Sequence, residues 1–275
     1  MEEFTRIIYQ PGTITRITLN RPEVRNAFDD RMIEELHHAA WLCDRDDQCR
    51  VVILSGGDGK VFSAGADINW MRSVVDYSWE ENVRDSERLA RMLDMIWKNR
   101  KPFICRVNGH AIGGGCGLVA VCDVAVALTR AKFGFTEVKL GIAPAVISPY
   151  VLRKIGFSHA RRFFLTGELF DAYEAQYIGL VHILADTIED MDLEVNRLAQ
   201  ELLTSSPNAI AHTKELVRSA WLMGGEQVLR YTVGKIAELR VSQQGQEGLR
   251  AFLEKREPEW VKELPEELRP KGKSK

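Results

Sequence analysis

The chain has 275 residues, of which 45% are hydrophobic and 28% charged, and its formal net charge is −2. A disordered chain would be less apolar and more unbalanced in charge, and a dedicated nucleic-acid binder would carry a basic excess. No apolar run approaches the ~20 residues that cross a bilayer. We therefore expect a globular fold with a sizeable core, and neither a nucleic-acid nor a membrane partner.

The cysteines and histidines argue against a disulfide framework and a metal site. The cysteine count is odd and no CxxC pair occurs, so neither disulfides nor structural zinc are expected. The six histidines show no HxxxH spacing. The acidic N-terminus lacks the apolar region of a signal peptide. These features predict a cytoplasmic protein without a bound metal.

The first half of the chain alternates between strand and helix patterns. FTRIIYQ and ITRITLN flank Pro11-Gly12 and predict a hairpin, and apolar spacing near 3.6 predicts a helix over 29–43. A second helix is expected over 79–97, and a third opens at the glycines 113–115 and runs to about 121. Apolar runs predict buried strands, at 51–55, 102–109 and 124–128.

From about residue 143 the patterns are mainly helical. The expected strand at 180–184 interrupts a series of helices, near 144–154, 158–165, 171–177, 187–203, 208–222 and 225–241. Alternating strands and helices build a layered α/β core. We place this core at 1–200 and a helical C-terminal region at 201–275.

Three segments have residue types suited to chemistry. Small residues at 63–66 let a ligand approach the backbone, and the glycines 113–115 expose N–H groups at a helix start, where they can stabilise an oxyanion. Glu137 is a single acid in a mostly apolar stretch, and burial would raise its pKa toward neutrality. Each segment alone also suits a structural role: a tight turn, a packed strand-to-helix turn or a solvated glutamate. Because the sequence has no GxGxxG, P-loop or GxSxG motif, chemistry is left to main-chain donors and carboxylates.

Together these segments resemble the crotonase superfamily, the enoyl-CoA hydratase/isomerase family. The similarity spans nearly the whole chain in the family's order and lies in NRPEVRNAF (20–28), FSAGADI (62–68), VNGHAIGGGCGLVAVCD (107–123), FGFTEVKLGIAP (133–144), LTGELFDAYEAQYIGLVH (165–182) and AFLEKREPEW (251–260). The resemblance implies a ClpP-like spiral of ββα units with a helical C-terminal trimerisation region. It also implies an acyl-CoA thioester as substrate, no further cofactor, and a homotrimer or a dimer of trimers.

The resemblance assigns site residues by position. The main-chain N–H groups of Ala66 and Gly114 would bind the thioester oxygen and stabilise an enolate, and Glu137 would be the acid/base. The positions matched to substrate and CoA binding are Arg25, Ala27, Ala64, Ala66, Asp67, Ile68, Gly113, Gly114, Phe252 and Lys255. Of these, Phe252 and Lys255 would contact CoA across a subunit boundary, although Lys255 also suits a solvated helix lysine.

One departure from the family limits the mechanism. Many hydratases carry two glutamates, and the first falls here on Gly117, which we count among the catalytic positions for that reason. Glu137 alone suits proton transfer at Cα, or between Cα and Cγ as in single-glutamate enoyl-CoA isomerases. Water addition would need another base, for which the substrate's own carboxylate or Asp76 is a hypothesis. A non-catalytic CoA-binding or RNA-binding paralogue is the third alternative.

A second departure is the bulky segment 143–150, where common hydratases are glycine-rich. This segment, Gly117 and Trp70-Met71 resemble bacterial methylglutaconyl-CoA hydratase-type enzymes. The resemblance favours hydration of a branched or carboxylated 2-enoyl-CoA, such as 3-methylglutaconyl-CoA.

Overall fold

The computed structural model describes residues 4–269, and its strands form two sheets. The larger sheet has the spatial order β1 (Ile7–Gln10), β2 (Ile14–Leu19), β3 (Val51–Ser55), β5 (Phe103–Val107), β7 (Val124–Leu128) and β10 (Ile183–Ala185). The smaller sheet has the order β4 (Val61–Ser63), β6 (His110–Ile112), β8 (Lys132–Gly134) and β9 (Leu169–Asp171). Pairing is parallel except for β1–β2 and β8–β9.

Successive strand pairs alternate between the two sheets. β3, β5 and β7 lie in the larger sheet, and the strands that follow them, β4, β6 and β8, lie in the smaller one. Helices return the chain to the larger sheet after the first two pairs, whereas after β8 the helix α5 leads to β9 in the smaller sheet before α6 and β10. This repetition is the expected spiral of ββα units, so the α/β fold class is confirmed.

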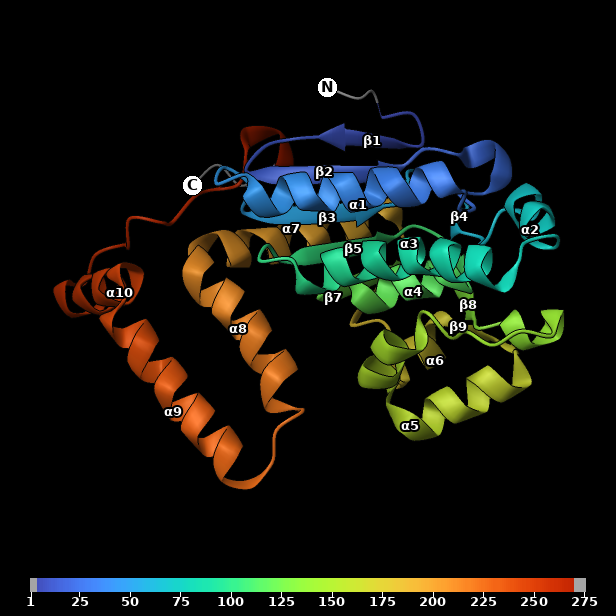
Figure 1. The fold of residues 1–275 in the computed structure, drawn as a ribbon. Helices are drawn as coiled ribbons and strands as arrows, with labels where there is room; N and C mark the ends of the chain where they lie inside the picture. The colour runs from blue at the N-terminus through green and yellow to red at the C-terminus, as the bar shows by residue number, and fades with distance from the viewer. Residues whose placement is uncertain (1–3, 270–275) are drawn as a thin grey trace.

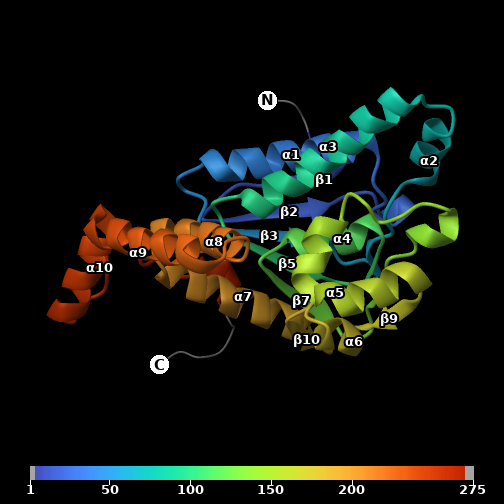
Figure 2. The same cartoon turned by 60° about the horizontal axis from the view of Figure 1, so that its bottom comes forward.

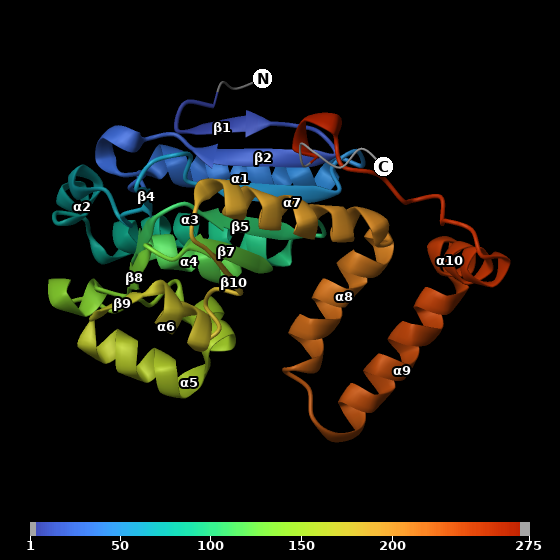
Figure 3. The ribbon, with the colours of Figure 1, turned by 180° about the vertical axis from the view of Figure 1, so that it is seen from behind.

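Both faces of the larger sheet are covered, which explains its continuous apolar strands. α1 (Asp30–Arg45), α3 (Trp79–Lys98) and α4 (Gly114–Val121) lie on one side, and α7 (Ile188–Thr204) crosses the other (Figures 1 and 3). Within β3, Val52 and Leu54 belong to the core beneath α1, whereas Val51 and Ile53 pack toward α7.

A buried glutamate ties the N-terminal segment to α1. Glu35 is 4% exposed, and its carboxylate accepts hydrogen bonds from the amides of Thr5, Arg6 and Ile7 and from Arg31 Nε. Burial acts to raise the pKa of Glu35, but these hydrogen bonds outweigh it and hold the pKa below its usual value.

α4 lies between α3 and α5 (Ser148–Thr166), as Figure 2 shows. α5 is kinked at Gly156, where φ is +74°, so the two expected helices meet at this residue. On the α4 side, Lys154 Nζ donates hydrogen bonds to Cys122 O at 2.6 Å and Val119 O at 3.4 Å. The C-terminal end of α4 is therefore held by a cation from α5.

The last helices extend away from the sheets. α8 (Pro207–Ala220) and α9 (Gly225–Val241) form a hairpin, and α10 (Gln243–Glu254) follows (Figures 1 and 3). α8 and α9 have no buried residue. The division expected at residue 200 stays a prediction: α7 runs through it and ends at Thr204. Residues 1–3 and 270–275 of the two expected regions lie outside the described residues.

The remaining elements show where sequence patterns were too short to read. The hairpin is confirmed, whereas β4, β6, β8, β9, α2 (Ile68–Val74) and α10 were not expected. The strand expected at 180–184 lies at Ile183–Ala185. The helix expected from 144 begins at Ser148, with Pro149 in its first turn, a position that proline favours. The helix expected near 171–177 is α6 (Ala172–Tyr177), and short helical turns add η1 (Pro22–Val24), η2 (Glu137–Leu140) and η3 (Glu266–Leu268).

Candidate active site

A cavity of about 450 Å³ lies where several distant segments meet. Its wall is formed by the turns around residues 64–66 and 112–114, by η2 and the segment after it, and by α2 and α3. Predicted site residues that line it are Ala64, Ala66, Gly113, Gly114 and Glu137. Most of the remaining wall is apolar, which suits an acyl chain.

The 64–66 turn is held beside Phe28 by main-chain hydrogen bonds. Phe28 N donates to Gly65 O at 2.7 Å, and Asp67 N donates to Phe28 O at 2.8 Å. Ala66 pairs with Phe28 in a parallel bridge. Because successive amides of an extended segment point to opposite sides, these bonds direct the Ala66 N–H away from Phe28.

The second turn begins α4. Gly113 has φ +52° and ψ −118°, a conformation that requires glycine, and Gly114 is the first residue of the helix. First-turn amides have no acceptor within their own helix. A Cβ atom built on Gly65 would lie 3.5 Å from Gly114 N, so the two turns are packed together. The cavity therefore has two neighbouring main-chain donors and the positive end of a helix.

Glu137 lies against this second turn. A Cβ atom on Gly113 would be 3.1 Å from Glu137 Oε1. Oε2 is buried and has no hydrogen-bond partner among the described residues. Burial raises the pKa of Glu137, partly offset by a main-chain hydrogen bond to its own amide. A carboxyl group whose pKa is raised in this way is suited to transferring a proton.

Gly117 contributes no side chain to the cavity. It is buried in α4, and a Cβ atom there would lie 2.4 Å from Ile147 Cγ2 and 3.2 Å from Ile147 Cβ. Ile147 itself lines the cavity. The space beside Gly117 is thus filled by an apolar side chain. Asp76, the alternative base suggested from the sequence, is exposed in the turn after α2 and does not line the cavity.

Four of the predicted substrate-binding residues flank the cavity without lining it. Arg25 is exposed, and its carbonyl accepts a hydrogen bond from Ala64 N at 3.0 Å. Ala27 is buried. Asp67 caps α2 and pairs with Arg21 at 2.9 Å, so its carboxylate supports the turn. Ile68 begins α2 and is 64% exposed.

Phe252 and Lys255 lie at the end of α10, away from the cavity of their own chain. Phe252 is 81% exposed, and Lys255 is an exposed residue with φ +55° that ends the helix. Neither lines the cavity.

Asp85 on α3 and Ile147 before α5 are among the cavity residues that the sequence interpretation did not assign to the site. The signal for Asp85 was present: Asn82, Asp85 and Leu89 share one helical face. Ile147 lies in the bulky segment 143–150 that the sequence singled out, but its contact with Gly117 has no local signal.

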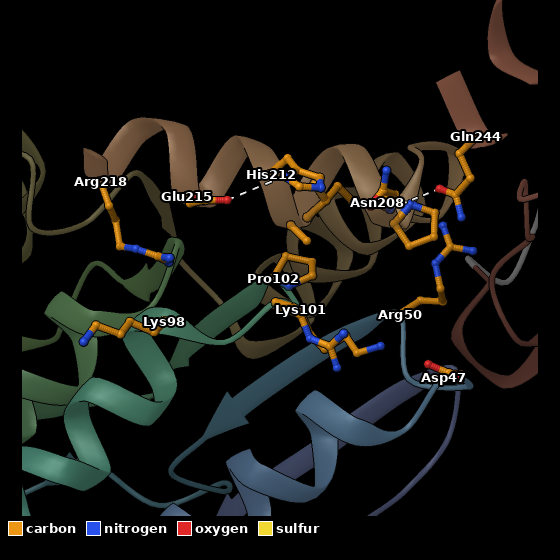
Figure 4. A pocket seen from close by; sticks show the side chains of 14 residues that line it. Asp47, Arg50, Lys98, Lys101, Pro102, Asn208, His212, Glu215, Arg218 and Gln244 are labelled. Atoms are coloured by element: carbon orange, nitrogen blue, oxygen red, sulfur yellow. Dashed lines mark hydrogen bonds and ion pairs between the residues drawn. The ribbon is translucent and has the colours of Figure 1, made fainter. Parts of the chain in front are cut away.

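A larger cleft of about 590 Å³ lies between α8 and the loops that follow α1 and α3 (Figure 4). Its wall is mainly charged and includes Arg50, Lys98, His212 and Glu215. Arg50 donates to three main-chain carbonyls, those of Leu203, Ser205 and Trp260, and Lys98 pairs with Asp94. These pairings are structural, so we take the smaller cavity as the candidate active site.

Comparison with known proteins identifies the family. Residues 10–263 match the model of the enoyl-CoA hydratase/isomerase family. A crystal structure of an enoyl-CoA hydratase from Shewanella pealeana has a TM-score of 0.90 and 41% identity, covering 94% of this chain and 97% of that one. AtuE of Pseudomonas aeruginosa has a TM-score of 0.89 and 34% identity, covering 94% and 100%. The short-chain-enoyl-CoA hydratase of Clostridium acetobutylicum is 29% identical, over 95% of this chain and 99% of its own. The chain belongs to the enoyl-CoA hydratase/isomerase family, a family of enzymes.

Residues 4–269 contain neither a metal-binding cluster nor a membrane-spanning helix. No group of three or more His, Cys, Asp or Glu side chains in this range is arranged to hold a metal ion. None of its helices combines the length and apolarity needed to cross a membrane.

Proposed function

We propose that the chain is an enoyl-CoA hydratase that adds water to a 2-enoyl-CoA thioester. The observation that carries this proposal is the Glu137 carboxyl group beside the Gly113–Gly114 turn, where a proton carrier meets main-chain donors. The amides of Ala66 and Gly114 would bind the thioester oxygen as negative charge develops on it, and Glu137 would exchange the proton at Cα. The CoA thioester is the substrate, and the proposal needs no further cofactor.

We propose a branched or carboxylated acyl group, with 3-methylglutaconyl-CoA as the first substrate to test. Support comes from the resemblance of segment 143–150 and from the way Val146 and Ile147 line the cavity, because bulky side chains shorten the space for a long straight chain. CoA binding by Arg25, Ala27, Ala64, Asp67 and Ile68 belongs to the same proposal. Ala64 lines the cavity, and the other four are close to its lining residues in the chain.

A single experiment compares hydration with isomerisation. The protein is incubated with crotonyl-CoA, 3-methylglutaconyl-CoA and a 3-enoyl-CoA, and the products are separated by chromatography. Hydration of a 2-enoyl-CoA supports the proposal, with faster turnover expected for the branched substrate. Isomerisation of the 3-enoyl-CoA without hydration of either 2-enoyl-CoA would overturn it.

The isomerase is the second candidate because Glu137 is the acid nearest the oxyanion turn and position 117 carries no carboxylate. One acid suffices for moving a proton between Cα and Cγ. A CoA-binding or RNA-binding paralogue without catalysis would convert none of the three substrates.

We also propose assembly into a homotrimer or a dimer of trimers. α8–α10 carry an unusual number of large exposed apolar side chains, Val217, Trp221, Leu222, Leu229, Val233, Ile236, Val241, Leu249, Phe252 and Leu253. Such a surface is typical of an interface. It would bring Phe252 and Lys255 to a neighbour's CoA. Size-exclusion chromatography with light scattering measures the mass of the assembly, and a monomeric mass would contradict the proposal.

A cytoplasmic location is part of the same proposal. Its support is the five cysteines, which are all buried free thiols of the kind that a reducing compartment preserves. Thiol titration of the unfolded protein from cytoplasmic extract tests this proposal.

A further inference from the structure

One face of α3 brings polar side chains to the wall of the cavity. Asn82, Asp85 and Ser86 line it together with Leu89, and their spacing of three and four residues places them on the same side of the helix. A purely acyl-binding wall would be apolar here. The polar stripe indicates that a polar group of the reaction lies next to α3.

Asp85 is held firmly at this wall. It is 6% exposed, and its Oδ1 accepts hydrogen bonds from Arg88 Nη2 at 2.8 Å and from Trp70 Nε1 at 3.3 Å. Trp70 also lines the cavity. Both hydrogen bonds are accepted by the same oxygen, so the carboxylate is oriented while Oδ2 can accept another. The positive charge of Arg88 balances the buried carboxylate.

The acids that line the cavity are Glu137 and Asp85. Hydration needs one group to take a proton from water and another to deliver a proton to Cα. Position 117 cannot supply the first group, because Ile147 fills the space beside it. We propose that Asp85 is the second carboxylate of the reaction, which binds the attacking water and accepts its proton. This proposal rests on the hydratase function above.

Water, the thioester and the two carboxyl groups account for every atom and proton in the addition of water to the double bond. The water oxygen bonds to Cβ, and the electron pair of the double bond moves to the thioester oxygen, held by the amides of Ala66 and Gly114. The water proton goes to Asp85. The enolate then takes a proton from Glu137 at Cα. Exchange with solvent returns Asp85 to the carboxylate and Glu137 to the acid.

The test separates the two carboxylates by the step each performs. Asp85→Asn and Asp85→Ser remove the carboxylate, and Glu87→Gln is the matched control. Glu87 lies on the same helix, outside the cavity, and pairs with Arg91 at 3.1 Å. Two rates are measured for each variant: hydration of a 2-enoyl-CoA, and exchange of the Cα hydrogen of the saturated acyl-CoA with deuterium from solvent.

We expect both Asp85 variants to lose hydration by about 100-fold or more, the usual worth of a general base. Cα exchange should stay within about threefold of wild type, because it needs only Glu137 and the two amides. Retained exchange also shows that the variant is folded. Glu87→Gln should leave both rates unchanged.

Other results would overturn the role of Asp85. Unchanged hydration in Asp85→Asn and Asp85→Ser removes it from the mechanism. Equal loss of hydration and exchange in both variants assigns Asp85 to the structure of the site rather than to water. A failure of the proposed hydratase function is distinguishable from a failure of the Asp85 role, because the wild-type protein itself would then form no 3-hydroxyacyl-CoA.

Discussion

Ile147 occupies the place that a side chain at position 117 would need. A Cβ atom on Gly117 would lie 2.4 Å from Ile147 Cγ2, closer than real Cβ contacts allow. Gly117 and Ile147 therefore depend on each other. The absence of a glutamate at position 117 is thus coupled to the presence of Ile147, which packs on Gly117 and closes one wall of the cavity.

Gly117→Glu should destabilise the protein without raising hydration. Overpacking of this kind typically costs about 1–3 kcal/mol, and a buried carboxylate adds to the cost. The double variant Gly117→Glu/Ile147→Gly removes the clash and should recover part of the loss. Urea unfolding gives the free energy of unfolding of the single and of the double variant. A single variant as stable as wild type would contradict the packing argument.

Gly114→Val should lower kcat by more than its loss of stability explains, since the new side chain presses on Phe28 as well as on the proposed oxyanion position. A Cβ atom there would lie 2.8 Å from Phe28 Cε2, and the valine methyls would approach the oxyanion position. Loss of one such donor lowers kcat by about 100- to 1,000-fold. Steady-state kinetics and unfolding are measured together. Gly59→Val is the matched control, because Gly59 is exposed and the nearest atom to a Cβ there is Val61 O at 4.0 Å. Near-normal turnover in Gly114→Val would refute the assignment.

Glu137→Gln should lose activity and gain stability at higher pH. We expect turnover to fall by about 100- to 10,000-fold, as for other general acid/base residues. Burial raises the pKa of Glu137, so wild-type stability decreases as pH rises from the usual value of 4.5 through the raised one, where the buried group ionises. Glutamine does not ionise. The variant's advantage in Tm should therefore grow as pH rises through that range and be complete above it, and a constant difference across pH would contradict this account.

Glu35→Gln should show the opposite dependence. The pKa of Glu35 is held below its usual value of 4.5. The stability that its ionised carboxylate contributes is therefore fully present above pH 4.5, and it is lost as the pH falls through the lowered pKa. Hydrogen bonds to a charged group contribute about 1.5–3 kcal/mol each, and Gln has one fewer acceptor for the amides of Thr5, Arg6 and Ile7. We expect a loss of about 2 kcal/mol or more near neutral pH that shrinks in acid. Glu34→Gln, the neighbouring exposed acid, should change little at any pH.

The order of elements and much of the candidate site could be read from the sequence. Buried parallel strands are continuous apolar runs, and the hairpin has its proline and glycine at the turn, so both are visible locally. The family resemblance brought residues 64–66, 113–114 and 137 together, and the structure places them in one cavity. Their catalytic roles stay predictions.

What the sequence did not reveal depends on contacts between distant segments. The three-residue strands β4, β6, β8 and β9 are too short to show a period and exist because they pair with one another. Ile147 is significant only because α5 begins against α4. Asp85 lies on a helix whose polar residues would ordinarily face solvent, and only the position of α2 and Trp70 encloses it.

The contacts of α5 with α4 determine how far the oxyanion turn can move. Ile147, just before α5, packs against Gly117, and Lys154, within α5, binds the carbonyls of Val119 and Cys122. The short helix is thus clamped along its side and at its far end. Its first amides are held in orientation before any ligand arrives, so the proposed binding of the thioester oxygen would need little rearrangement as charge forms. A substitution in α5 that is distant from the cavity would consequently lower kcat.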